Sequence, residues 1–90
     1  MSEIRDDAAR SRYELRADDG TAVAAYQRRG DTMVFTHTRV PPALEGRGIG
    51  SALIAGALAD VRARHLKVQP DCPFVAAYID RHPAERDLLA

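Results

Sequence analysis

Hydrophobic and polar residues alternate over most of the first half of the chain, which is the pattern of half-buried β-strands. A first strand is predicted from Ser11 to about residue 17, and two more over residues 21–27 and 32–40. The third is rich in β-branched and aromatic residues, which favour strands. Asp19-Gly20 and Gly30-Asp31 lie between the strands and are typical of tight turns. The pattern therefore predicts an antiparallel meander of three strands.

The spacing of apolar residues becomes helical in the second half of the chain. Pro41-Pro42 ends the third strand, and an apolar stripe then runs from Ile49 to about Arg64. A short strand over residues 65–69 and a helix from Pro73 to about His82 follow, with one more helical turn expected near the end. A strand, a helix and a strand in succession predict a parallel crossover. The predicted order is β-β-β-α-β-α, an α+β fold with a mostly antiparallel sheet flanked by two helices.

The length and composition limit the chain to a small globular unit. A chain of ninety residues has room for one domain. We predict that this domain covers residues 11–90 and that residues 1–10 are a flexible lead-in. Thirteen basic residues balance thirteen acidic ones, which argues against a nucleic-acid partner. Twelve of the basic residues are Arg and one is Lys, a bias that suggests a GC-rich bacterial genome.

The cysteine content and the distribution of apolar residues indicate a compartment. Cys72 is the single cysteine, so an internal disulfide and a four-cysteine zinc site are excluded. No apolar run approaches the ~20 residues of a membrane span, and the first ten residues are charged where a signal peptide is apolar. We therefore expect a cytoplasmic protein without a membrane partner.

The most informative segment is the glycine-rich stretch Glu-Gly-Arg-Gly-Ile-Gly-Ser at residues 45–51, between a strand and a helix. Glycines let the backbone approach a ligand, and the free N–H groups of a helix N-terminus attract anions. The spacing matches neither the Walker loop nor the dinucleotide-binding fingerprint. The stretch is either a cradle for pyrophosphate or a flexible loop that caps the helix.

The glycine loop resembles the acetyl-CoA loop of the GNAT acyltransferase superfamily. Four segments together are similar to the small YjdJ-type minimal N-acetyltransferases: His-Thr-Arg-Val-Pro-Pro at 37–42, Glu-Gly-Arg-Gly-Ile-Gly-Ser-Ala-Leu-Ile at 45–54, Pro-Asp-Cys-Pro-Phe at 70–74 and Tyr-Ile-Asp-Arg-His-Pro at 78–83. The resemblance covers roughly residues 11–89. One departure is Glu45, where the superfamily usually has Gln or Arg, and an acidic side chain is unfavourable beside phosphates unless it points away.

The resemblance implies a position for acetyl-CoA, the co-substrate that it predicts. Pantetheine would pair with the backbone of the third strand, as an added strand does, at Thr38, Arg39 and Val40. The pyrophosphate would lie on the loop formed by Gly46, Arg47, Gly48, Ile49, Gly50 and Ser51. Arg39 and Arg47 are candidates for the outer phosphates, or are solvated surface arginines.

Three residues are candidates for catalysis. His37 ends the third strand and suits a general base at neutral pH, and Cys72 precedes a helix whose dipole favours a thiolate. The minimal family has such a His and Cys pair at its active centre, although His37 could be structural and Cys72 a buried apolar residue. Cys72 could carry the acetyl group, or the amine could attack directly, the usual route in the superfamily. Tyr78 either protonates the CoA sulfur or packs the last helix onto the sheet.

The predicted function is transfer of an acetyl group from acetyl-CoA to an amine. A non-catalytic acyl-CoA binding or sensing module would keep the glycine loop without needing His37 or Cys72, and an interaction domain with a decayed site would bind no CoA. The strands are joined by tight turns, so the acceptor groove should be open, for a small molecule or a protein side chain. His65 and His82 are predicted to be surface or capping residues, and no metal site is expected. We expect a monomer or a weak homo-oligomer.

Overall fold

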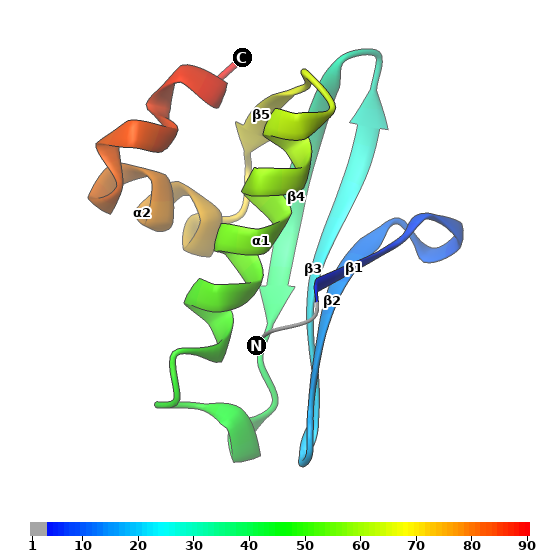
Figure 1. Ribbon diagram of the computed structural model, residues 1–90, viewed down its shortest axis with the longest axis vertical. Helices are drawn as coiled ribbons and strands as arrows, with labels where there is room; N and C mark the ends of the chain where they lie inside the picture. Colours follow the sequence, from blue (N-terminus) through cyan, green and yellow to red (C-terminus); the bar gives the residue numbers. More distant parts are fainter. Residues whose placement is uncertain (1–3) are drawn as a thin grey trace.

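A five-stranded sheet with the strand order β1-β2-β3-β4-β5 forms the centre of the computed structural model, which describes residues 4–90 (Figure 1). The pairs β1–β2, β2–β3 and β3–β4 are antiparallel, and the pair β4–β5 is parallel. The strands and helices are β1 (Ile4–Asp7), β2 (Arg12–Ala17), β3 (Gly20–Arg29), β4 (Thr32–Arg39), α1 (Ile49–Ala63), β5 (Lys67–Pro70) and α2 (Pro73–Arg81), with 3-10 turns η1 (Ala8–Arg10), η2 (Pro42–Leu44) and η3 (Pro83–Leu88).

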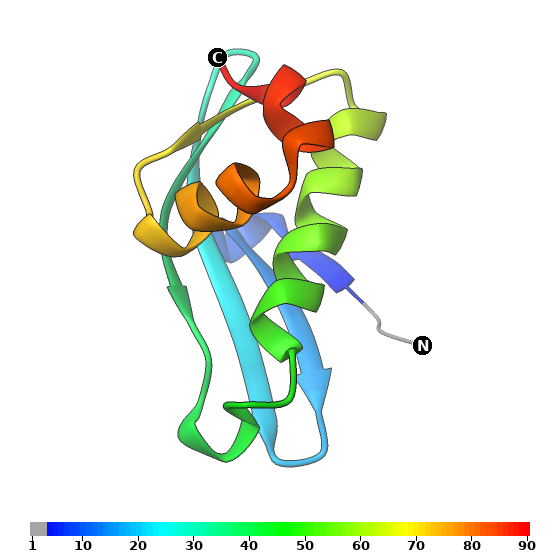
Figure 2. The same ribbon diagram turned by 90° about the vertical axis from the view of Figure 1, so that its left-hand side faces the viewer.

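Both α-helices lie on the same face of the sheet, with α1 over β2 and β3 and α2 beside it over β4 and β5 (Figures 1 and 2). The core lies between this helical layer and the sheet, where apolar side chains alternate inward from each strand. Its largest fully buried members include Tyr13 of β2, Phe35 of β4 and Leu53 of α1. The predicted α+β fold and the parallel crossover from β4 through α1 to β5 are confirmed.

The predicted flexible lead-in is wrong over residues 4–10, which form β1 and η1; residues 1–3 lie outside the described part of the chain. Strand β1 pairs with β2 along the edge of the sheet. Its sequence, Ile-Arg-Asp-Asp, has one apolar residue and two that disfavour strands. This strand is therefore stabilised by tertiary contacts and not by the strand propensity of its own residues.

Asp6 provides the main polar contact between β1 and the rest of the fold. The Tyr26 hydroxyl donates a hydrogen bond to Asp6 Oδ1 at 2.6 Å, and the Arg64 guanidinium lies 3.0 Å from Asp6 Oδ2. Burial and the hydrogen bond to Asp6 raise the pKa of Tyr26 to about 12, so this hydroxyl remains a donor at neutral pH. The carboxylate thus connects the edge strand to β3 and to the C-terminal end of α1, where Arg64 follows Ala63.

Strands β4 and β5 pair over only part of β4, and this opens one edge of the sheet. Their register runs from Thr32 opposite Lys67 to Phe35 opposite Pro70. One further backbone bond follows, from the Cys72 N–H to the Phe35 carbonyl at 2.9 Å. Beyond Phe35, β4 continues to Arg39 paired with β3 alone. The last part of β4 therefore has a free backbone edge.

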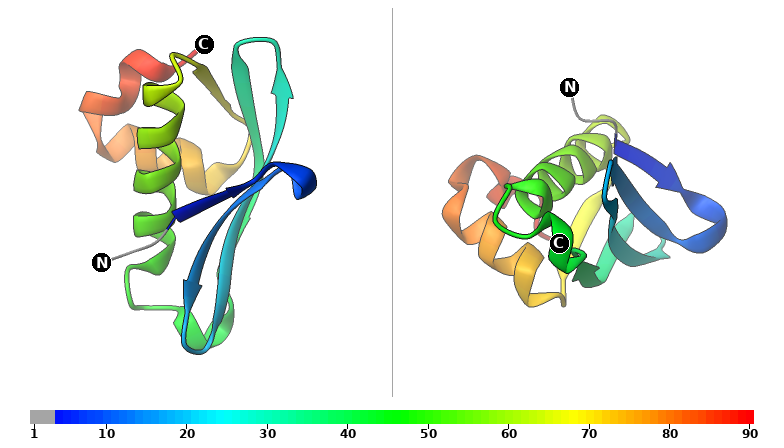
Figure 3. Two further views of the ribbon diagram at one scale, coloured as in Figure 1. Left: turned by 45° about the vertical axis from the view of Figure 1, so that its right-hand side comes forward. Right: turned by 90° about the horizontal axis from the view of Figure 1, so that it is seen from below.

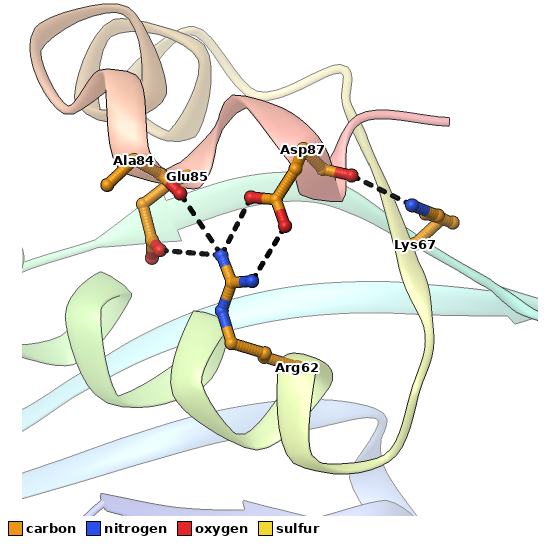
Figure 4. A network of polar contacts seen from close by, with 5 residues as sticks. All are labelled: Arg62, Lys67, Ala84, Glu85 and Asp87. Atoms are coloured by element: carbon orange, nitrogen blue, oxygen red, sulfur yellow. Dashed lines mark hydrogen bonds and ion pairs between the residues drawn. The ribbon is translucent and has the colours of Figure 1, made fainter.

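The C-terminal turn η3 is held against α1 by Arg62 (Figure 4). Its guanidinium donates to both carboxylate oxygens of Asp87, at 2.7 and 2.9 Å, and to Glu85 Oε1 at 3.0 Å. Lys67 Nζ donates to the Asp87 carbonyl at 2.8 Å. The hydrogen bonds from Arg62 hold the pKa of Asp87 below its usual value of 3.8.

This arrangement predicts a pH-dependent contribution to stability. A carboxyl group whose pKa is lower in the folded state stabilises the fold above its unfolded-state pKa and loses that effect as the pH falls through its folded-state pKa. We expect Arg62→Gln to lower the melting temperature by a few degrees at pH 7 and to have little effect at an acid pH low enough to protonate Asp87 in the folded state. Thermal unfolding of both proteins at the two pH values measures the difference. An equal gap at both values would contradict the role of Asp87.

Candidate active site

A groove of about 530 Å³ opens beside the free edge of β4 and the head of α1. Strand β4 and the residue after it form one wall, the segment from η2 into α1 forms the other, and the start of α2 closes one end. The lining residues are Thr38, Arg39, Val40, Leu44, Glu45, Gly46, Gly48, Ile49, Gly50, Ser51 and Phe74. They include every residue predicted to bind the co-substrate except Arg47.

The glycine loop presents unpaired backbone donors to this groove. Gly46 and Gly48 have φ values of +77° and +72°, a left-handed conformation that side chains rarely adopt. Within residues 4–90, the N–H groups of residues 46–51 have no acceptor in the protein, and no side chain caps α1. Unpaired donors at the positive end of a helix are favourable neighbours for negative charge.

Gly50 and Phe74 shape the floor of the groove where α2 meets α1. A Cβ atom at Gly50 would lie 2.7 Å from Phe74 Cζ and 3.2 Å from Val40 Cγ2, so any side chain here would displace the Phe74 ring. Phe74 remains 37% exposed although it is a large apolar residue. The groove thus combines polar donors with an apolar surface, as small-molecule sites commonly do.

The two arginines proposed for outer phosphates differ in position. Arg39 lines the groove. Arg47 does not, because its guanidinium lies 3.6 Å from the Asp19 carboxylate in the turn between β2 and β3. Glu45, the departure noted in the sequence, also lines the groove. Arg39 and Glu45 are the charged residues among the described lining, so the groove has one positive and one negative side chain.

Cys72 lies at the start of α2 with its thiol in the core. The side chain is 3% exposed, and its Sγ lies 3.3 Å from the Thr38 hydroxyl on β4. Thr38 also lines the groove, so the thiol adjoins the groove wall. A nucleophilic thiol needs a base within hydrogen-bond reach, and in residues 4–90 the polar partner of this thiol is a hydroxyl group.

His37 lies on the opposite face of the sheet from Cys72. The register places Thr38 opposite the buried Ala24, and His37 opposite Ala25. Because side chains alternate along a strand, His37 points away from the helices, and it is exposed. Strands β4 and β5 are neighbours as predicted, but the structure does not bring the His37 and Cys72 side chains into contact.

Tyr78 lies in the middle of α2 and away from the groove lining. It is 7% exposed, and its ring stacks on His82 with centroids 3.9 Å apart. Burial, and to a smaller degree the charge of Glu85, raise the pKa of Tyr78. The ring therefore packs in the core and against His82, and the predicted role in protonating a sulfur has no contact with the groove to support it.

Leu44 and Phe74 are lining residues that the sequence reasoning did not identify. Leu44 belongs to η2, which begins at the second of two successive prolines, and Phe74 comes directly after Pro73. No local sequence pattern marks either residue as part of the lining. Over residues 4–90 no three His, Cys, Asp or Glu side chains gather as metal ligands, and none of the described helices has the length and apolar character to cross a membrane.

The fold and the groove define a class of protein. A mostly antiparallel sheet whose last two strands are parallel and diverge, with a glycine loop at the head of the intervening helix, is the GNAT-like architecture. Residues 12–88 match the sequence model described as GCN5-related N-acetyl-transferase, and the chain belongs to that family. No curated protein matches the chain. Membership supports a general acetyltransferase function.

Proposed function

We propose that this protein is an acetyl-CoA-dependent N-acetyltransferase that acts on an amine. The observation that supports this most strongly is the row of unpaired N–H groups at residues 46–51, all of which except Arg47 line the same groove as the free edge of β4. The donors suit the pyrophosphate of acetyl-CoA, and the strand edge suits the amides of its pantetheine arm. Phe74 adds an apolar surface for the methylene groups.

The role that we assign to each group of the chain follows from its position. Acetyl-CoA supplies the thioester: a C–N bond forms to the acceptor amine, the C–S bond breaks, and CoA leaves as its thiolate. His37, exposed at the end of β4, would take a proton from the acceptor amine. The backbone N–H groups on the free edge of β4 would stabilise negative charge on the carbonyl oxygen. Because β5 leaves β4 after Phe35, this edge is open to the face that carries His37.

Direct attack by the amine is favoured over an acetylated Cys72. The thiol is buried and its partner is the Thr38 hydroxyl, which cannot serve as a base. We expect Cys72→Ser, which retains a partner for Thr38, to lower the transfer rate by less than about tenfold. A covalent route would instead require a loss of about 100-fold or more. Steady-state rates decide between the two, and mass spectrometry of protein quenched during turnover reports any acetyl group on Cys72.

The proposal as a whole is tested with radiolabelled acetyl-CoA and a panel of amines. We expect labelled product and release of CoA that depends on the acceptor. CoA binding without acceptor-dependent release, unchanged by His37→Ala or Cys72→Ala, would instead identify a binding or sensing module. Absence of CoA binding in calorimetry would contradict both and leave an interaction domain with a decayed site.

A further inference from the structure

The face of the sheet opposite the helices contains a second hollow, of about 750 Å³. Figure 3 shows that α1 and α2 both lie on the other side of the strands. The lining residues are Arg5, Asp7, Arg10, Arg12, Glu14, Arg16, Thr21, Val23, Arg39 and Pro41, which we call the arginine basin. Five of them are arginines and two are carboxylates, so the basin has an excess of positive charge although the whole chain is neutral.

The strand register explains why the basin is hollow. One row across the sheet runs Arg5, Glu14, Val23 and Arg39, and the next runs Asp7, Arg12, Ala25 and His37. In both rows β3 contributes a small side chain between longer ones on the neighbouring strands. The small residues of β3 therefore form a floor, and the charged side chains of β1, β2 and β4 form the walls.

The arginines of the basin are not all neutralised. Arg12 Nε lies 2.8 Å from Glu14 Oε2, and Arg10 Nε lies 3.8 Å from Asp7 Oδ2. Within residues 4–90, Arg5, Arg16 and Arg39 form no ion pair with a carboxylate. Three guanidinium groups around one hollow are thus available for an external anion, and their planar fork suits a carboxylate.

The basin adjoins the proposed site of transfer. Arg39 lines both the basin and the co-substrate groove, and the two hollows share no other lining residue. His37 follows Arg39 in the next row and on the same face. An acceptor held in the basin would therefore lie beside the proposed base, with the acetyl donor on the other side of the free edge of β4.

The size and charge of the basin favour a peptide as the occupant. The basin spans β1 to β4, which is about 14 Å at the ~4.8 Å spacing of strands, or roughly four residues of extended chain. Asp7 and Glu14 lie among the arginines, so a uniformly negative phosphate chain would meet two carboxylates. A peptide carrying acidic groups and an amine matches this mixture of charges.

We propose that the arginine basin binds the acceptor and selects a peptide segment in which acidic residues flank the amine that is acetylated. That the bound amine is then acetylated rests on the proposed transferase function. Peptide binding to the basin can be measured without acetyl transfer, so the binding proposal and the transferase proposal can fail separately.

The test uses two fluorescein-labelled peptides, Glu-Glu-Lys-Glu-Glu and Gln-Gln-Lys-Gln-Gln, in fluorescence anisotropy titrations of the full chain. We expect the acidic peptide to bind at least about tenfold more tightly, since hydrogen bonds between charged groups are the stronger ones. Arg5→Gln/Arg16→Gln should weaken acidic-peptide binding by about tenfold. Arg29→Gln/Arg81→Gln, which removes two exposed positive charges elsewhere, should leave it unchanged.

Calorimetry with CoA on the same variants separates the basin from the groove. CoA affinity should be equal in the wild type and in Arg5→Gln/Arg16→Gln, because neither residue lines the groove. Equal binding of the two peptides, or equal losses in the two double variants, would overturn the proposal. Tighter binding of a thymidine hexanucleotide than of the acidic peptide, lost in Arg5→Gln/Arg16→Gln, would assign the basin to nucleic acid instead.

Discussion

Replacing His37 with Gln should lower the rate of acetyl transfer about 100-fold, the usual contribution of a positioned general base. CoA affinity should not change, because His37 does not line the groove and lies on the opposite face of the sheet. Steady-state transfer rates, with calorimetry for CoA, measure both effects.

His65→Asn is the matched control for His37→Gln. His65 is also exposed, and it follows α1 with a φ of +58°, a conformation that Asn tolerates. Its replacement should leave the rate unchanged. A His37→Gln variant that keeps the wild-type rate, or a His65→Asn variant that loses as much, would contradict the role of His37 as the base.

Replacing Gly48 with Val should weaken CoA binding by about tenfold or more. A β-branched residue at a φ of +72° costs about 1–3 kcal/mol, and relief of that strain would turn the N–H groups of the loop away from the groove. The effect is expected on affinity, measured by calorimetry, and on the KM for acetyl-CoA. The maximal rate at saturating acetyl-CoA should change less.

Gly30→Val provides the control for strain alone. Gly30 has a φ of +60° with open space around its Cβ position, and it lies in the turn between β3 and β4, outside the groove lining. This variant should lose comparable thermal stability and retain CoA affinity. If both variants lose CoA affinity equally, general destabilisation would explain the result and the loop would have no direct part in binding.

The position of the groove could be predicted from the sequence because its parts depend on local rules. Three glycines and a serine at the start of an apolar helical stripe indicate free donors, and a β-rich segment just before them indicates a strand edge. The structure brings these segments together in one groove. Phe74 could not be identified as a lining residue, because its place in the groove depends on the close approach of α2 to Gly50, which no local pattern reports.

The face on which His37 lies could not be predicted, because a β-bulge reverses the alternation of side chains. Met33 and Phe35 both point into the core, and simple alternation would place His37 there too, beside Cys72. The register shifts between Ala25 and Tyr26, so that β4 has an extra residue at Thr36. Thr38 therefore faces the helices and contacts Cys72 in place of His37.

Strand β1 was missed for a different reason. Its two aspartates favour turns over strands, and Asp6 is stabilised by partners from distant parts of the chain, Tyr26 and Arg64. This strand also supplies Arg5 and Asp7 to the arginine basin. An edge strand held by long-range polar contacts thus completes the face on which we place the acceptor.

The most direct test of the central claim, that the glycine loop binds acetyl-CoA, is a titration of ¹⁵N-labelled protein with CoA followed by amide NMR. New hydrogen bonds to phosphate oxygens should move the amide signals of residues 46–51 further than any others, with smaller shifts at Thr38, Arg39 and Val40. Gly48→Val should reduce these shifts at the same CoA concentration. Absence of shifts at residues 46–51 under conditions where CoA binds, or shifts confined to the opposite face of the sheet, would contradict the proposed site.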